Sequence, residues 1–513
     1  MPSWEIKDHL PPVERSPVPR TFLRQAPPDA RVIAIIGGGF TGAMTLANLL
    51  RQARGTLEPL HFVLIDNQPT IGKGVAYRTD DARHLLNVPV EKMSAWPDCP
   101  GDFLKFAQAH DGSIKPGAFL PRKLYGQYVR QQLFDLAELA ADRVSVELIQ
   151  DLATTLTPSS NFSQWHIATA AGRALSAELA IVTLGHRPPE EDFSRQWKGP
   201  RERFVADPWT MPILGQIGPE EPVLLLGSGL TAVDTILSLD REDRTGRLTV
   251  LSRRGLWPQS HASQPKPPVD LSQTAATWLD SSNPLTVRVL LRTLRHHVKL
   301  AAGKNVDWRQ VTDGLRPFTA KLWARFDLIE RKRFLRHGRA FWEIHRHRMA
   351  PQVAERLSLL QARNLLDLTA GGLSSAEADD DGVNALLKCR GNAPARNLRV
   401  AWVINCTGPG AHTRQTTHPI LRPLLDSGVL LGDDLSLGLH TDADGRALSA
   451  SGVAHANLLI AGTLRKSTLW ESTAVPELRQ QAAAVAATAL RTLAANCCAG
   501  EADGHFPCRS TSD

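Results

Sequence analysis

Apolar runs and amphipathic segments alternate along the chain from Arg31 onward. Residues 31–53 (RVIAIIGGGFTGAMTLANLLRQA) form a β-branched apolar run, a glycine turn and a stretch with helical apolar spacing. HFVLID is a second apolar strand that ends at Asp66. A helical stretch near 122–141, the strand RVSVELIQ, a short meander and the strand ELAIVTLG complete the pattern. Strands that alternate with helices predict a doubly wound parallel sheet.

The same order of elements occurs a second time. EPVLLLGSGLTAVDTILSLD is again strand, glycine turn and helix, and GRLTVLSRRG is the next strand. NLLDLTA, a Gly/Asp-rich meander near 371–390 and the buried strand RVAWVINCTG follow much later. The interruption, roughly 259–362, begins Pro-rich and continues with two long predicted helices, LTVRVLLRTLRHHVKLAAG and FTAKLWARFDLIERKRFLRHGRAFWEIHRHRMAP. We therefore expect two similar α/β units, the second with a helical insertion.

Length and composition agree with this division. The chain has 513 residues, and single cores stop growing near roughly 250–300 residues. The net charge of +7 slightly favours anionic small molecules and does not by itself indicate nucleic acid. No apolar run is long enough for a membrane span, and the N-terminus has no secretory pattern, so we expect a cytoplasmic protein. No cysteine spacing is typical of a metal site, so we expect no bound metal.

The first glycine turn carries a dinucleotide-binding pattern, Gly37-x-Gly39-x-x-Gly42, between a strand and a helix. Such glycines allow a tight turn, close approach of a pyrophosphate and close helix–strand packing, and the helix N-terminus attracts the phosphates. An acid at the end of the next strand accepts the ribose hydroxyl groups, which suits FAD or NAD. The predicted ligands here are Gly37, Gly39, Phe40, Thr41, Gly42 and Asp66.

The second glycine turn has a related pattern with Ala232 in place of the third glycine. Its following strand ends in basic residues, Arg253 and Arg254, at what the pattern predicts to be the position of Asp66. Arginines at that place favour NADPH over NADH because they pair with a 2′-phosphate, the alternative being a solvated basic face. The predicted NAD(P)H ligands are Gly227, Ser228, Gly229, Leu230, Thr231, Arg253 and Arg254. We therefore predict an α/β chain with two Rossmann-like domains, one for FAD and one for NADPH or NADH.

Six segments, two of which overlap the second glycine turn and its following strand, resemble one bacterial family of FAD/NAD(P)-binding proteins that includes an FAD-dependent urate hydroxylase and an aspartate N-hydroxylase. They are GKGVAYRTDDARHLLNVPVEKMSAWP, FVADPW, LLLGSGLTAVD, LSRRGLWP, FLRHGRAFWEIHRHRMAP and GTLRKSTLWESTAVPELRQQA. The resemblance covers roughly residues 31–490. One departure is Arg203, which stands where many two-unit flavin monooxygenases carry a histidine, and it disfavours Baeyer–Villiger chemistry.

The resemblance implies an FAD- and NAD(P)H-dependent monooxygenase that hydroxylates a small polar or anionic metabolite through a flavin hydroperoxide. Urate is the first candidate substrate, as in purine catabolism. The alternatives are N-hydroxylation of an amino acid and a flavin oxidoreductase that inserts no oxygen. Partners are then the substrate and dioxygen, with no nucleic acid and no membrane. No catalytic residue is assigned, because the cofactor carries the chemistry, and the oligomeric state stays open.

The resemblance also places further residues near FAD: Lys73, His84, Asn87, Gly462, Trp470, Glu471 and Thr473. For His84 and Asn87 the alternative is hydrogen bonding within the loop, and for the C-terminal group an ordinary packed helix. His345 and His347 are two residues apart and point to different helix faces, which argues against a typical two-histidine helix metal site. The interpretations left are a contact to the substrate or nicotinamide and, favoured over it, a basic, partly buried helix. The arginines from Arg331 to Arg348 offer charge for an anionic substrate or form an interface.

These observations predict the following division of the chain. The tails are 1–30 and 497–513, the FAD domain comprises 31–195 and 411–496, the NAD(P)H domain comprises 205–258 and 363–410, and the insertion is 259–362. A third hypothesis, in which the basic insertion binds nucleic acid or a protein, is weaker, since its tryptophans have the spacing of a helix core.

Overall fold

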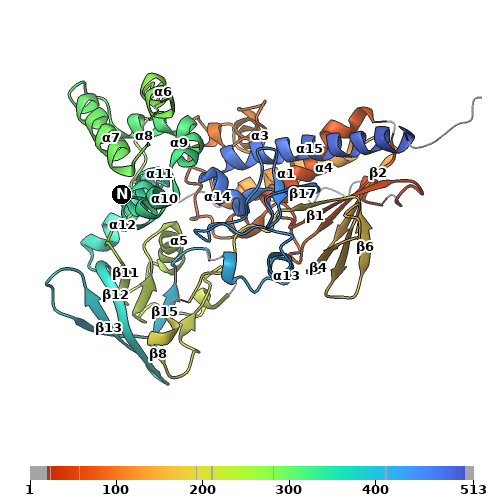
Figure 1. Ribbon diagram of the computed structural model, residues 1–513. Coiled ribbons are helices and arrows are strands. Elements are labelled where there is room, and N and C mark those ends of the chain that lie inside the picture. Colours follow the sequence, from red (N-terminus) through yellow and green to blue (C-terminus); the bar gives the residue numbers. More distant parts are fainter. Residues whose placement is uncertain are drawn as a thin grey trace, which may run out of the picture.

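Two parallel-sheet units form the framework of the computed structural model, which describes residues 20–502 except 24, 57, 192, 210, 211, 281, 283, 411 and 412. The unit with helices α1 and α15 and the unit with strands β10 to β15 lie side by side, and the insertion helices stand above the second unit (Figure 1). This confirms the predicted α/β class with two Rossmann-like domains. The numbered domain limits stay a prediction.

The first unit is built on a six-stranded sheet. Its order is β16 (Arg446–Leu448), β17 (Ala454–Ile460), β7 (Leu179–Val182), β1 (Arg31–Ile36), β2 (Leu60–Ile65) and β3 (Val144–Ile149). Apolar side chains of one face pack against α1 (Phe40–Gln52), α4 (Arg122–Glu138) and α15 (Val475–Ala502). The other face is covered by β4 (Ala153–Pro158), β5 (Trp165–Thr169), β6 (Ala174–Ala177) and α13 (Leu421–Asp426). Strand β17 pairs parallel with β7, so the chain returns to this sheet after the second unit.

The second unit repeats the central arrangement. Its sheet order is β14 (Arg396–Val400), β13 (Gly382–Cys389), β12 (Leu366–Asp379), β11 (Leu248–Ser252), β10 (Val223–Leu226), β15 (Trp402–Asn405) and β9 (Phe204–Val205), with β8 (Trp197–Lys198) on β12. Helices α5 (Leu230–Leu239) and α12 (Pro351–Ala362) pack on one face. The predicted single strand RVAWVINCTG is wrong: β14 pairs antiparallel with β13, and β15 pairs parallel with β10.

The insertion is a helical subdomain with its own apolar core, which contains Trp278, Trp323 and Phe334. Its helices are α6 (Ser272–Asp280), α7 (Val287–Ala302), α8 (Trp308–Leu315), α9 (Thr319–Arg325), α10 (Leu328–Arg333) and α11 (Arg339–Arg346). The prediction of one long helix from Phe318 onward is wrong, since Asp327 caps a new helix by accepting from Glu330 N. A π-helical segment, Phe334–Gly338, then joins α10 to α11.

Both predicted tails are shorter than expected where the structure describes them. Residues Arg20–Leu23 form a 3-10 turn in which the Phe22 ring packs edge-on against Phe134 of α4, with the centroids 5.5 Å apart. At the other end α15 continues to Ala502. Residues 1–19 and 503–513 lie outside the described part. The shorter helices are α2 (Gly74–Tyr77), α3 (Asp102–His110) and α14 (Lys466–Leu469).

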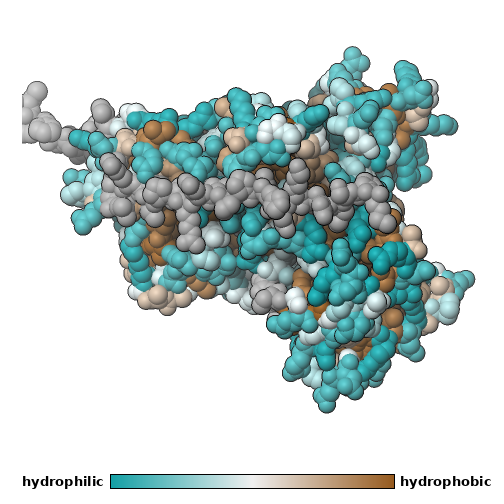
Figure 2. Space-filling view, turned by 180° about the vertical axis from the view of Figure 1, so that it is seen from behind, coloured by the Kyte–Doolittle hydropathy of each residue, from teal (hydrophilic) through white to brown (hydrophobic). Residues whose placement is uncertain are grey.

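The face seen in Figure 2 is mainly hydrophilic, with apolar patches between polar side chains. Among the described residues, no helix combines the length and the apolar character that a membrane crossing requires. Nor do three or more His, Cys, Asp or Glu side chains come together there as metal ligands.

Candidate active site

The first glycine turn forms an open cradle at the N-terminus of α1. Gly37 has φ +107°, and a Cβ there would lie 2.5 Å from Thr183 O, so only glycine fits. No side chain caps α1, which leaves its first N–H groups for a ligand. The nearest atom to a Cβ at Gly39 would be Gly74 Cα at 3.6 Å. This geometry suits a pyrophosphate at the helix terminus.

Asp66 follows the carboxyl end of β2, beside this cradle. Its Oδ2 accepts from Gly38 N, and its Oδ1 accepts from Gln68 N at 2.7 Å. Each carboxylate oxygen keeps a further lone pair for the hydroxyl groups of a ribose. The Phe40 ring points away from the cradle into the core, packed on Tyr77 and Tyr125. Phe40 therefore has only its backbone to offer to a cofactor.

The second cradle has the same backbone form. Gly227 has φ +105°, and α5 begins without a side-chain cap. An added Cβ at Gly229 would meet no atom of the described residues within 4 Å, which leaves space for a phosphate over the helix terminus. Ser228 Oγ donates to Leu256 O at 2.7 Å, which ties the turn to the segment after β11.

Backbone pairing corrects the predicted position of the two arginines. Gly37 N donates to Ile65 O and Gly227 N donates to Leu251 O, both at 2.8 Å. Ser252 therefore corresponds to Asp66, and Arg253 and Arg254 follow one and two residues later. The Arg254 guanidinium lies 4.9 Å from the centre of the Phe341 ring and donates to Arg336 O. Arg253 is exposed, so it is the better placed of the two for a 2′-phosphate.

Gly462 meets the first cradle although it lies far away in the sequence. A Cβ at Gly462, which has φ +85°, would lie 3.1 Å from Thr41 Oγ1. Thr463 Oγ1 donates to Gly185 O at 2.6 Å, because β17 and β7 are parallel and end at the same sheet edge. Ser472 Oγ donates back to Gly462 O, so residues 463–471 form a closed excursion beside the cradle.

The excursion contacts the insertion rather than open solvent. Trp470, with φ +59°, packs on Trp323 at 4.7 Å and on Phe334 at 5.0 Å between ring centroids. Glu471 Oε1 accepts from Trp342 Nε1 at 3.1 Å. These protein contacts support a packing role for Trp470 and Glu471. The half-buried Thr473 beside Ser472 makes no such contact with the residues that the structure describes. Their predicted contact with FAD stays untested.

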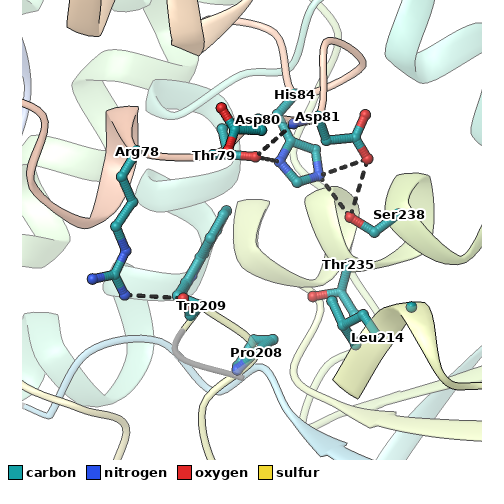
Figure 3. Close-up of a pocket in the computed structure, with 11 residues that line it drawn as sticks. Arg78, Thr79, Asp80, Asp81, His84, Pro208, Trp209, Leu214, Thr235 and Ser238 are labelled. Carbon is teal, nitrogen blue, oxygen red and sulfur yellow. Dashed lines mark hydrogen bonds and ion pairs between the residues drawn. The ribbon is translucent and has the colours of Figure 1, made fainter. Parts of the chain in front are cut away.

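His84 links the two units, as Figure 3 shows. Its Nδ1 lies 2.8 Å from Thr79 Oγ1, and its Nε2 lies 2.9 Å from Ser238 Oγ and 3.0 Å from Asp234 O of α5. The Nδ1 contact is the expected hydrogen bond within the loop, whereas the Nε2 contacts reach the other unit. A contact between His84 and FAD stays a prediction. Asn87 is partly exposed, and its carbonyl accepts from His261 Nε2 at 2.9 Å. The stem of Lys73 packs near Gly126 of α4.

A pocket of about 590 Å³ lies beside His84, between residues 78–84 and α5. Asp81 Oδ2, at 3.8 Å, and Ser238 Oγ both approach the same nitrogen, Nε2, of His84. In a Ser-His-Asp triad the acid and the nucleophile occupy opposite ring nitrogens. The group is therefore an interdomain contact and not a nucleophilic triad, which agrees with chemistry carried by a cofactor.

A polar cluster that sequence reasoning did not assemble lies between the excursion and the insertion. Burial and the nearby Lys466 charge lower the pKa of His186 to about 4, and burial lowers the pKa of His347 to about 3. Burial, assisted by Arg339, also lowers the pKa of Lys466. These residues stand in segments quoted above for the family resemblance, except His186, but no spacing in the sequence shows that they meet.

Residues 34–187 match a protein-family model described as FAD-NAD(P)-binding. This match confirms the predicted cofactor class, FAD with NAD(P)H. An uncharacterised protein of Escherichia coli K12, YdhS, is 22% identical over 269 residues, which are 46% of this chain and 48% of that protein. The chain thus spans about half the length of the curated relative it matches.

Three solved structures share the fold over nearly their whole length. An ornithine hydroxylase of Pseudomonas aeruginosa is 16% identical with TM-score 0.57, covering 90% of this chain and 100% of that one. An ornithine N-hydroxylase of Kutzneria sp. 744 is 12% identical with TM-score 0.57, covering 90% and 99%. An L-lysine 6-monooxygenase of Pseudomonas syringae is 16% identical with TM-score 0.55, covering 90% and 99%. At these identities the likeness shows the fold alone.

Proposed function

We propose that this protein is an FAD- and NAD(P)H-dependent monooxygenase that hydroxylates the amine nitrogen of a small amino acid. The observation that carries the proposal is the presence of two open dinucleotide cradles in one chain, within a fold shared with ornithine and lysine hydroxylases. The predicted alternative, an amino-acid N-hydroxylase, now takes first place. Urate, the first candidate from the sequence, has no support among the similar structures.

The reaction is R–NH₂ + O₂ + NAD(P)H + H⁺ → R–NHOH + NAD(P)⁺ + H₂O. One oxygen atom enters the N–O bond and the other leaves as water, while the nicotinamide gives up a hydride. FAD, when bound, supplies the redox centre at which electrons from NAD(P)H meet dioxygen. The chain's own residues bind the dinucleotides at the N-termini of α1 and α5, orient the substrate and exclude water.

The test measures NADPH and NADH oxidation, oxygen uptake, peroxide and product mass with L-ornithine, L-lysine, L-aspartate and urate. We expect one amino acid to accelerate oxygen uptake and to yield a product heavier by one oxygen atom, with little peroxide. If urate is hydroxylated and no amino acid is, the substrate is a purine and not an amine. If every compound gives only peroxide, or if a quinone is reduced equally well without oxygen, the monooxygenase proposal fails and the oxidoreductase alternative stands.

A further inference from the structure

Strand β11 of the second unit leads directly into a tight turn formed by Ser252, Arg253, Arg254 and Gly255. Gly255 N donates to Ser252 O at 3.3 Å and to Ser252 Oγ at 3.1 Å. Gly255 has φ +60°, and a Cβ there would lie 2.9 Å from the Cβ of Ala370 in β12, so the position requires glycine. The two arginines therefore occupy the central positions of a turn whose backbone conformation is fixed.

This arginine turn lies beside the second cradle. Gly227 N donates to Leu251 O at 2.8 Å, and Ser228 Oγ donates to Leu256 O at 2.7 Å. The glycine turn is thus bonded to the residue before the arginine turn and to the residue after it. The first residue of the arginine turn corresponds to Asp66, at the position where a Rossmann-like domain contacts the adenosine ribose. Adenine and any 2′-phosphate are attached to that ribose, so both groups come within reach of the turn.

The two arginines of the turn have different surroundings. Arg253 is exposed, whereas Arg254 is partly buried. The guanidinium of Arg254 lies over the Phe341 ring of α11, with its Cζ 4.9 Å from the ring centre. Its NH2 group donates to Arg336 O at 3.1 Å. Both partner groups, a ring and a backbone carbonyl, are uncharged, so they fix the plane of the guanidinium without neutralising it.

The insertion reaches the arginine turn through its π-helical segment, Phe334–Gly338, which contains Arg336. Such segments are rare and occur frequently at functional sites. A Cβ at Gly338 would lie 2.8 Å from the Phe334 ring, so a larger residue would displace that buried ring. Phe341 follows three residues later and is 44% exposed. In Figure 1, α10 and α11 lie on the side of the insertion nearest the second sheet.

A guanidinium held in this way is a flat, charged surface with two faces, and the Phe341 ring covers one of them. Arginine stacks face to face on aromatic rings, and adenine is an aromatic ring of the coenzyme. Arg253, which directly follows Ser252, offers its donors for a charge-assisted pair with a phosphate. The two arginines therefore suit two different parts of the adenosine half of NAD(P)H.

We propose that Arg254, positioned by Phe341 and Arg336 O, forms the adenine subsite of the second cradle, so that the helical insertion takes part in coenzyme binding. The base stacks on the face of the guanidinium opposite to Phe341. Phe341 is a positioning residue, because it acts through Arg254. The inference rests on the proposed function only in assigning NAD(P)H to the second cradle. Since NADPH and NADH carry the same adenine, Phe341 affects the affinity for both and not the choice between them.

Calorimetric titration of the FAD-loaded protein with NADP⁺ and with NAD⁺ measures coenzyme binding without turnover. We expect Phe341→Ala to weaken the binding of both coenzymes about three- to tenfold, the size of one stacking contact, and to leave the flavin absorbance unchanged. Phe341→Tyr keeps the ring and should retain the wild-type affinities. The matched control is Phe162→Ala, which removes a ring of the first unit that is 45% exposed and should change neither affinity.

Arg253→Gln provides the contrasting result. It removes the charge predicted to pair with the 2′-phosphate, so NADP⁺ should bind about tenfold more weakly and NAD⁺ about as well as before. The ratio of the two affinities therefore distinguishes a contact to the base from a contact to the phosphate.

Equal weakening of both coenzymes in Phe341→Ala, with wild-type affinities in Phe341→Tyr, supports the adenine subsite. Weakening of NADP⁺ alone would overturn it, because Arg254 would then pair with the 2′-phosphate. Unchanged affinities would also overturn it, since the insertion would take no part in the site. These results do not involve hydroxylation, so product analysis judges the monooxygenase proposal separately. If the wild type binds neither coenzyme, the inference is overturned and the proposed use of NAD(P)H fails with it.

Discussion

Two glycines of the second cradle separate folding from coenzyme binding. A Cβ at Gly227 would lie 2.3 Å from Cys406 O in a backbone with φ +105°, whereas a Cβ at Gly229 would meet no protein atom within 4 Å. We expect Gly227→Ala to lower the free energy of unfolding by about 2 kcal/mol or more. Gly229→Ala should leave that free energy unchanged but raise KM for NAD(P)H about tenfold, because the methyl group occupies phosphate space.

Urea unfolding and steady-state kinetics measure both effects, and flavin absorbance serves as the control because the first cradle is untouched. A Gly229→Ala variant with wild-type KM would show that no phosphate binds over α5. Glycine spacing in the sequence predicts both positions. It does not predict the pairing that aligns Ser252 with Asp66, because that register is set between strands.

At the scale of elements, the contact between α11 and the segment leading into α15 depends on buried charge. Glu471 and Arg346 side chains are 7% and 8% exposed. Glu471→Gln keeps an acceptor for Trp342 but removes the charge opposite Arg346. We expect the free energy of unfolding to fall by about 1–3 kcal/mol, measured by urea titration. The matched control is Glu377→Gln, whose pair with Lys198 is exposed and should contribute about 0–1 kcal/mol. Equal losses in the two variants would contradict this account.

Local pattern predicts the elements better than their interruptions. The alternation of apolar runs anticipates β1, α1, β2 and their counterparts β10, α5 and β11. The long helix expected from Phe318 is interrupted because Asp327 offers a cap at a site where helical propensity alone would continue. The split of β14 from β15 has no local signal, since each strand is selected by a different partner.

For the molecule as a whole, two half-buried histidines make the free energy of unfolding depend on pH. The pKa values of His261 and His347 are lowered by burial from 6.5 to about 4 and about 3. Below pH 6.5 the unfolded chain binds protons on both rings and the folded protein does not. The free energy of unfolding therefore falls with decreasing pH, by at most about 1.4 kcal/mol per pH unit for each ring, and by less where solvent reaches it.

Urea titrations at pH 7, 6 and 5 test this expectation. His347→Gln should weaken the decline between pH 6.5 and 4, and His166→Gln, at an exposed position of β5, should preserve it. If the free energy of unfolding depends on pH equally in the wild type and in His347→Gln, the His347 ring is protonated in the folded protein as well.

The polar cluster around Lys466 also belongs to the scale of the whole molecule, and for that reason sequence reasoning did not find it. His186, Glu343 and Lys466 come from three separate stretches of the chain, and only the closed fold unites them. Each of the three stretches has a recognisable local pattern, such as the end of a strand or the face of a helix. No local pattern shows which distant stretch will lie next to it.

The packing of the insertion on Trp470 and Glu471, beside the first cradle, has an evolutionary consequence. Because residues 259–362 contain neither glycine turn, substitutions and length changes there leave the residues of both cradles unaltered. Chimaeras that exchange residues 259–362 between distant homologues should therefore keep the bound flavin and the coenzyme choice.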